Sequence, residues 1–349
     1  MKTPYFIVYP DRIAANYRLM ASTLPVDRLY YATKANGEAP TLSALAEAGA
    51  GFEIVCADEM EELLALGVKP ENIICSLPIK TAEEIARMYA LGCRYFVYDS
   101  EGQYELLQKL SPEAKKIVRL QLRFVSPHDL VYGLYPEEIA DMARRGKLPD
   151  GYTFYIFERD NWVEKLNGVF DALEELMAAR EDGSPLLLNL GGHYVLPSAE
   201  TAAVFDTLRQ RVARLRALRP GLRVIAEPGG CIVNTAYDMV TTVTETRNGD
   251  WVFIDANKYT FRDTEAVIEP YGEIEKCPPK TLYFLDSLCS GNILAQQTAD
   301  YAPRIGDRLI VRSVGAYSIC FATNFHRTGK PGIVNYALDI SAPCDRMDP

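Results

Sequence analysis

Short apolar runs recur along the first two-thirds of the chain and alternate with segments of helical periodicity. The runs are rich in β-branched and aromatic residues, as buried strands are. They occupy residues 29–33, 51–55, 73–77, 95–99, 117–123, 152–157, 186–192 and 223–229. In the helical segment 81–92, Thr81 is a candidate N-cap, Glu84 stands at the third helical position and Gly92 closes the pattern. Eight strand–helix units over about two hundred residues predict a closed (β/α)8 barrel of the TIM type. A doubly wound sheet is the alternative, and the near-equal units favour closure.

The pattern changes after Gly230, where the chain becomes rich in strands and poor in helices. Asn-Gly, Pro-Pro and Gly-Asp turn signals separate the apolar runs. These runs occupy residues 237–245, 251–255, 281–285 and 308–314. The opening run 5–9 precedes the first barrel unit by a helix-like segment, so it has no place in the barrel. We therefore predict a barrel over 24–230 and a second, mostly β domain built from 1–23 and 231–349.

Composition narrows the classes of protein that fit. A net charge of −10 makes nucleic acid and anionic membranes poor partners. No signal peptide and no apolar run of roughly twenty residues is apparent, which favours a cytoplasmic protein. The eight cysteines show no CxxC pair, and the three histidines lack the spacing of a zinc site. Free thiols in a reducing compartment and no catalytic metal are therefore expected.

Lys34 stands out because it lies at the carboxyl end of the first barrel strand. Function in such barrels resides at that face. A lysine that is partly desolvated there has a lowered pKa, and its neutral amine can form a Schiff base with a carbonyl. A lysine that merely reaches the surface from a strand end is the alternative.

Other polar or glycine residues end neighbouring strands and favour the chemical interpretation of Lys34. They are Glu53, Tyr155, Gly191-Gly192-His193 and Glu227-Pro228-Gly229-Gly230. Glycine pairs after the seventh and eighth strands stand where barrels bind phosphate through backbone N–H groups. A carboxylate beside a phosphate site makes sense if the ligand also carries a basic nitrogen. An aldehyde, a phosphate and a ring nitrogen together describe pyridoxal 5′-phosphate, PLP.

Five segments then resemble, in order, the motifs of the fold-type III PLP decarboxylases, which include ornithine, diaminopimelate and carboxynorspermidine decarboxylases. The resemblance runs from Pro4 to about Phe325. The segments are 31–36 (YATKAN), 52–59 (FEIVCADE), 188–192 (LNLGG), 227–229 (EPG) and 315–317 (GAY). The resemblance implies the barrel plus β-domain fold that ornithine decarboxylase shares with alanine racemase.

The resemblance also implies roles for individual residues. Lys34 would hold PLP as an internal aldimine, and Glu227 would keep the pyridine nitrogen protonated so that a quinonoid carbanion can form. Glu53 and Tyr155 would lie against the cofactor, with Tyr155 in place of a stacking histidine. The phosphate would be surrounded by Gly191, Gly192, Gly229, Gly230 and Tyr317. Gly230 replaces an arginine that often follows this motif.

In this family two subunits share each active site, so the resemblance implies a homodimer. The β domain of the partner would supply Cys289, which reprotonates the product, and we expect Tyr317 to meet Lys34 across the same interface. Substrate recognition falls on four candidates: Glu158, Arg262, Asp263 and Asn292. Asn292 replaces the usual acidic residue, and Arg262 would suit a distal carboxylate whereas Asp263 would suit a distal amine.

The expected function is thus decarboxylation of a small amino acid with a polar far end, of the diamino-acid or carboxy-polyamine type, as in polyamine biosynthesis. An amino-acid racemase on the same architecture is the alternative, with Lys34 as one base. A PLP-binding regulatory protein is a barrel without a β domain, so residues 231–349 argue against it. A vestigial enzyme that serves as a scaffold is a further alternative, given Tyr155, Asn292 and Gly230.

Overall fold

The computed structural model describes residues 1–122, 132–184, 186–260, 266–289, 291–323 and 330–336. Contacts divide the chain into two compact units. One contains residues 16–34 and 45–229, and the other contains 1–15, 35–44 and 230–349. The second unit therefore takes in residues 35–44, which the sequence pattern assigned to the barrel.

The first unit is a closed barrel of eight parallel strands, β2 to β9, as the sequence predicted. Its strands are β2 (Arg28–Ala32), β3 (Gly51–Ile54), β4 (Ile73–Cys75), β5 (Tyr95–Tyr98), β6 (Lys115–Arg119), β7 (Gly151–Thr153), β8 (Leu187–Asn189) and β9 (Arg223–Ala226). Pairing of β2 with β9 closes the ring, with Arg28 opposite Ile225. Each strand lies within or beside one of the predicted runs. The ends differ most at β6, which begins two residues earlier than predicted and ends at Arg119.

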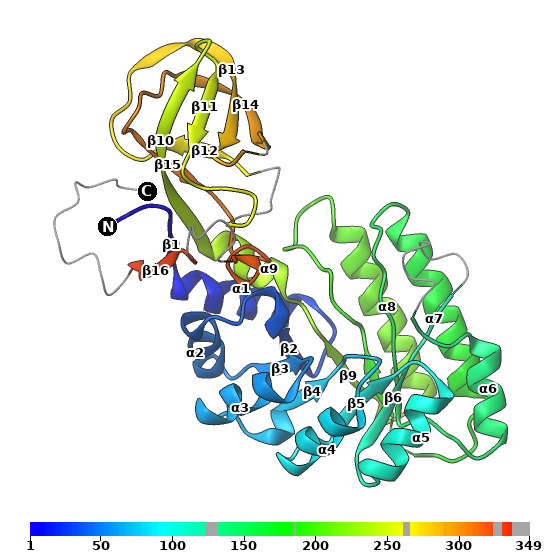
Figure 1. Cartoon of the computed structure of the whole chain (residues 1–349). Helices are drawn as coiled ribbons and strands as arrows, with labels where there is room; N and C mark the ends of the chain where they lie inside the picture. The colour runs from blue at the N-terminus through cyan, green and yellow to red at the C-terminus, as the bar shows by residue number, and fades with distance from the viewer. Residues whose placement is uncertain (123–131, 185, 261–265, 290, 324–329, 337–349) are drawn as a thin grey trace. The chain divides into compact units, whose positions relative to one another are not determined.

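Helices α3 to α8 lie around the outside of the barrel strands (Figure 1). The α-helices in the described residues are α1 (Pro10–Thr23), α2 (Ala39–Glu47), α3 (Ala57–Ala65), α4 (Ala82–Ala90), α5 (Glu101–Leu110), α6 (Pro136–Arg144), α7 (Trp162–Ala178), α8 (Ala202–Leu218) and α9 (Gly230–Val233). The N-cap predicted for α4 is confirmed, because the Thr81 hydroxyl accepts the Glu84 N–H at 3.2 Å. Ser100 caps α5 in the same way.

Buried side chains from six different strands form one core cluster of the barrel. They are Tyr30, Ile74, Val97, Ile117, Leu187 and Ile225. Burying one large apolar side chain contributes about 1.5–3 kcal/mol, so this cluster is a principal source of barrel stability. Parallel strands covered on both faces need such continuous apolar runs, which is why the sequence signal was clear.

The second unit contains an eight-stranded, mostly antiparallel sheet. Its strands are β1 (Tyr5–Val8), β10 (Tyr237–Arg247), β11 (Trp251–Ile254), β12 (Ile268–Pro270), β13 (Lys276–Asp286), β14 (Ile293–Tyr301), β15 (Arg308–Val311) and β16 (Gly332–Asn335). β1 pairs with β10 and β16, which confirms that the opening strand joins this sheet. Strands β12, β14 and β16 were not predicted.

The Pro-Pro turn signal in this unit was wrong. Pro278 and Pro279 lie inside β13, whose pairing with β14 shifts register between Lys276 and Lys280. An irregularity of this kind accommodates residues that cannot donate to the ladder. The strand therefore continues through the two prolines.

Two kinds of feature are absent from the described part of the chain. No helix there is long and apolar enough to cross a membrane. No group of three or more His, Cys, Asp or Glu side chains there is arranged to hold a metal ion.

Candidate active site

Lys34 lies immediately after β2, in the short 3-10 turn Thr33–Ala35. Its Nζ donates to Glu53 Oε2 at 2.9 Å, and its side chain is half exposed whereas that of Glu53 is buried. The Thr33 hydroxyl donates to the backbone oxygen of Glu53 at 2.9 Å, which fixes the end of β2 against β3. The amine is thus held at the carboxyl end of the barrel strands and remains open to solvent on one side.

Glu53 is a buried carboxyl group at the carboxyl end of β3. Its Oε1 is buried and has no hydrogen-bond partner among the residues that the structure describes. Burial raises the pKa of Glu53 to about 7. The charge of Lys34 lowers this pKa and offsets the effect of burial only in part, whereas the charge of the nearby Glu227 raises it further. A buried acidic oxygen without a hydrogen-bond partner destabilises the fold unless a bound ligand supplies the missing hydrogen bond.

Removing this buried acid should stabilise the protein in a pH-dependent way. Between its ordinary pKa of 4.5 and about 7, the folded protein keeps a Glu53 proton that the unfolded chain has released. The free energy of unfolding therefore falls with rising pH across this window. We expect Glu53→Gln to be more stable than the wild type by a margin that grows to about 1–3 kcal/mol near pH 7. Urea unfolding at several pH values measures this margin.

The control for this prediction is Glu62→Gln, since Glu62 is exposed on α3. Its difference from the wild type should stay flat across the same pH range. A Glu53→Gln margin that is flat or shrinks as the pH rises would contradict the account of Glu53.

Glu227 lies directly after β9 and is held by two donors. The Ser76 hydroxyl and the Asn189 amide both donate to its Oε1, the latter at 2.6 Å. Burial raises the pKa of Glu227, and these two hydrogen bonds oppose that rise because they favour the ionised form. Neither bond uses Oε2, which leaves that oxygen for a cationic or N–H partner.

The glycines after β8 are required first by the barrel itself. A Cβ at Gly191 would lie 2.3 Å from the Phe154 carbonyl oxygen, and one at Gly192 would lie 2.6 Å from that of Glu227. Gly191 also has a φ of +67°. Its N–H donates to Asn189 Oδ1 at 2.9 Å, so this donor is already used within the chain. The phosphate role of Gly191, Gly192 and the buried Gly229 stays a prediction.

Tyr155 follows β7 and belongs to an aromatic group. Its ring centroid lies 5.9 Å from that of His193, and Phe157 stacks on His193. The guanidinium of Arg119 lies over the Tyr155 ring at 5.5 Å. Glu158 is exposed and lies 3.5 Å from Lys165 Nζ. The stacking role of Tyr155 and the substrate role of Glu158 are not tested by these contacts.

The remaining predicted site residues belong to the second unit. Cys289 is exposed, and the Asn292 amide donates to Asp286 Oδ2 at 2.8 Å. Gly230 begins α9, and a Cβ there would meet the Tyr317 ring at an ordinary 3.6 Å. Arg262 and Asp263 lie outside the described residues.

Tyr317 is held by a backbone hydrogen bond within the second unit. Its N–H donates at 2.8 Å to the backbone oxygen of Ala35, the residue that follows Lys34. The position of Tyr317 across a subunit interface stays a prediction, as does the contribution of Cys289 from a partner subunit.

Ser76 and Asn189 belong to the site but were not among the predicted residues. Each is a polar residue at or just after the end of a barrel strand, β4 and β8 respectively. The rule that selected Lys34 and Glu227 applies equally to them. Asn189 even lies within the Leu188–Gly192 motif.

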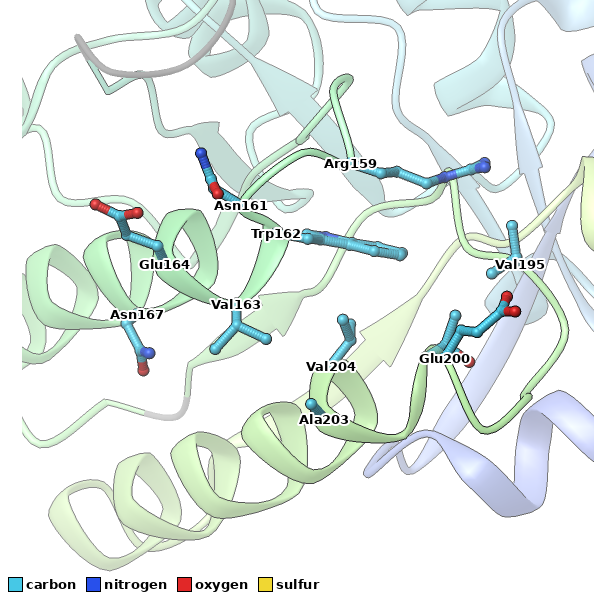
Figure 2. Close-up of a pocket in the computed structure, with 11 residues that line it drawn as sticks. Arg159, Asn161, Trp162, Val163, Glu164, Asn167, Val195, Glu200, Ala203 and Val204 are labelled. Carbon is cyan, nitrogen blue, oxygen red and sulfur yellow. The ribbon is translucent and has the colours of Figure 1, made fainter.

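A separate cavity of about 820 Å³ lies between the beginnings of α7 and α8 (Figure 2). Arg159, Trp162 and Glu200 contribute to its lining. Among the described residues, no predicted site residue lines it. Its connection to the site is indirect, since Arg159 donates to the backbone oxygen of His193 at 3.1 Å.

Comparison with known proteins finds similar decarboxylases. Residues 10–130 match the family model described as pyridoxal-dependent decarboxylase, pyridoxal binding domain. The chain is 27% identical to lysine/ornithine decarboxylase of Selenomonas ruminantium over 353 residues, covering 93% of this chain and 87% of the relative. It is 27% identical to diaminopimelate decarboxylase of Pseudomonas aeruginosa over 367 residues, covering 94% and 86%.

A solved structure gives the same result. The chain superposes on SrLDC in complex with PLP and cadaverine with a TM-score of 0.81 and 26% identity, covering 96% of this chain and 91% of the other. These matches confirm the resemblance to the fold-type III PLP-dependent decarboxylases that the sequence motifs predicted. The predicted fold and cofactor are confirmed as well.

The residues of this decarboxylase fit PLP. Lys34 offers an amine at the barrel mouth, and Glu227 offers an oxygen, Oε2, that neither of its two donors uses. Glu53 adds a buried acidic oxygen without a partner in the described structure. A cofactor with an aldehyde and a basic ring nitrogen suits a site that offers one amine and two buried acids.

Proposed function

We propose that this decarboxylase acts on a small amino acid whose side chain ends in an amine, a diamino acid or a carboxy-polyamine, with Lys34 as the cofactor-binding lysine. The observation that carries the proposal is the convergence of Lys34, Glu53 and Glu227 at the carboxyl ends of β2, β3 and β9. The names of the relatives, which specify lysine, ornithine and diaminopimelate, support the substrate class.

The chain's own residues would act as follows. PLP, when bound, supplies an aldehyde for the amine and a ring that accepts electrons as carbon dioxide leaves. Lys34 would bind the aldehyde and yield it to the substrate amine. Glu53, 2.9 Å from Lys34 Nζ, would take up the proton that the lysine must lose. Glu227 would hold a proton on the ring nitrogen through Oε2, with Ser76 and Asn189 fixing Oε1.

A screen of amino acids with the purified protein and added PLP tests the activity. Lysine, ornithine, arginine and meso-diaminopimelate are compared with glutamate and leucine, and both carbon dioxide and the product amine are measured. We expect equimolar carbon dioxide and amine from at least one of the first four, with kcat/KM at least about a hundredfold above that for leucine. Loss of optical rotation without carbon dioxide would instead identify a racemase.

We also propose that the enzyme is a homodimer in which Cys289 of one subunit returns a proton to the product in the other. Cys289 is an exposed thiol in the second unit, in a sequence segment that resembles the family's cysteine motif. Cys289→Ala should then divert some turnovers to an aldehyde product, with the amino group left on the cofactor. Product analysis by mass spectrometry gives the ratio of aldehyde to amine.

Mixing variants tests whether the site is shared. When equal amounts of Lys34→Ala and Cys289→Ala subunits exchange, about one quarter of all sites should regain both residues by counting the pairings. The aldehyde fraction should then fall below that of Cys289→Ala alone. Cys277→Ala, which changes another cysteine of the same unit, is the control and should give amine only. An unchanged aldehyde fraction in mixed dimers would mean that each site is built within one chain.

A further inference from the structure

Lys80 is a buried lysine with no function in the site as described so far. It is 5% exposed, and its ammonium donates to three backbone oxygens: Leu77 at 2.7 Å, Pro78 at 3.2 Å and Val97 at 2.5 Å. Three donors and three acceptors satisfy the ammonium completely. No carboxylate of the described residues forms an ion pair with it.

These bonds fix the segment that connects β4 to α4. The backbone of Lys80 is fixed as well, because its N–H donates to Gln103 Oε1 and its carbonyl accepts from Gln103 Nε2, both at 3.1 Å. At the other end of the segment, the Ser76 N–H donates to the Ile54 oxygen of β3 at 3.3 Å. A segment held at both ends by backbone bonds has little freedom to move.

The side chain that this segment presents is Ser76, whose hydroxyl donates to Glu227 Oε1. Together with Asn189, Ser76 therefore determines how the carboxylate is oriented. We propose that Ser76 is a positioning residue for Glu227 and that buried Lys80 acts through it, by fixing the segment 76–80. The inference rests on the proposed function in one respect only, namely that Glu227 contacts the ring nitrogen of PLP.

Burial also lowers the pKa of Lys80, which is the cost of placing an ammonium there. A side chain that only packed against the strand ends could be apolar and would avoid this cost. Lys116 offers a matched comparison: it is also 5% exposed, burial lowers its pKa, and it donates to the Pro112 and Ala114 oxygens. Lys116 lies at the amino end of β6, opposite to the face where strands present the site.

The test follows the Glu227 carboxyl carbon by NMR in cofactor-free, full-length protein labelled with ¹³C-glutamate. The background is Glu53→Gln, which leaves only one of the two buried acids to titrate, and Glu227→Gln assigns the signal. Ser76→Ala should raise the midpoint of the Glu227 pH titration, because a hydrogen bond to the charged form is lost. Ser76→Thr, which keeps the hydroxyl, should restore it. Lys80→Met should raise it too, whereas Lys116→Met should not.

In the PLP-loaded enzyme with Glu53 intact, Ser76→Ala and Lys80→Met should each lower kcat roughly tenfold, the size of one charge-assisted hydrogen bond, with little change in KM. The inference is overturned if Ser76→Ala leaves the midpoint unchanged or if Lys80→Met behaves as Lys116→Met does. Should Lys80→Met fail to fold, Gln103→Leu loosens the same residue and must raise the midpoint. Because the titration needs neither PLP nor turnover, it can succeed even if the proposed activity fails.

Discussion

Lys34→Ala should abolish turnover, with kcat reduced by about 10⁴-fold or more, because the variant lacks the amine that would exchange the cofactor with the substrate. Lys34 is the lysine that the structure joins to the buried Glu53, at the carboxyl end of β2. The half-exposed side chain contributes little to packing, so the variant should fold, with a cost in stability because Glu53 loses its ion pair. Single-turnover carbon dioxide release measures the loss.

Lys115→Ala is the matched control for this variant. Lys115 also pairs with one carboxylate, Asp150, at 3.0 Å, but it begins a barrel strand instead of following one. Its removal should change kcat less than twofold. Residual activity of Lys34→Ala within tenfold of the wild type would remove Lys34 from the mechanism.

Glu227→Gln should lower kcat by roughly a hundredfold or more, the value of about 2–4 kcal/mol that one positioned electrostatic contact contributes to catalysis. Gln keeps an oxygen for the Ser76 and Asn189 donors but cannot hold a proton on a ring nitrogen. Some cofactor binding should persist, since Lys34 remains. Steady-state kinetics and cofactor absorbance give both quantities.

The control here is Asp238→Asn, another buried carboxylate, which bonds Arg312 and Tyr9 in the second unit. That change should cost stability but leave kcat within a fewfold. If Glu227→Gln raised KM alone and left kcat intact, the carboxylate would be a substrate ligand and its assignment to the ring would be wrong.

The barrel could be predicted from the sequence because its strands are buried on both faces and read as continuous apolar runs. The second unit was harder. Strand β14 alternates between buried and exposed positions without a clean period, and β12 is only three residues long. Strand β13 runs through two prolines that normally indicate a turn. Such strands are specified by their partners in the sheet more than by their own pattern.

The site residues differ in the same way. Some are recognisable from the local sequence, whereas others have a role only through a contact with a residue that is distant in the sequence. Lys34, Glu53 and Glu227 were recognisable because each stands at the end of a strand as an ionisable group. Ser76 is separated from Glu227 by 151 positions, and its hydroxyl has meaning only through that contact. The bond from Tyr317 to Ala35 is likewise invisible in the sequence.

The most direct test of the central claim is borohydride reduction of the protein with bound PLP, followed by peptide mapping. Reduction fixes a Schiff base as a stable amine on whichever lysine carries the cofactor. The account predicts a yellow protein, stoichiometric labelling of the peptide that contains Lys34, and loss of the label in Lys34→Ala but not in Lys115→Ala. Labelling of any other lysine, or a colourless protein that takes up no PLP, would contradict it.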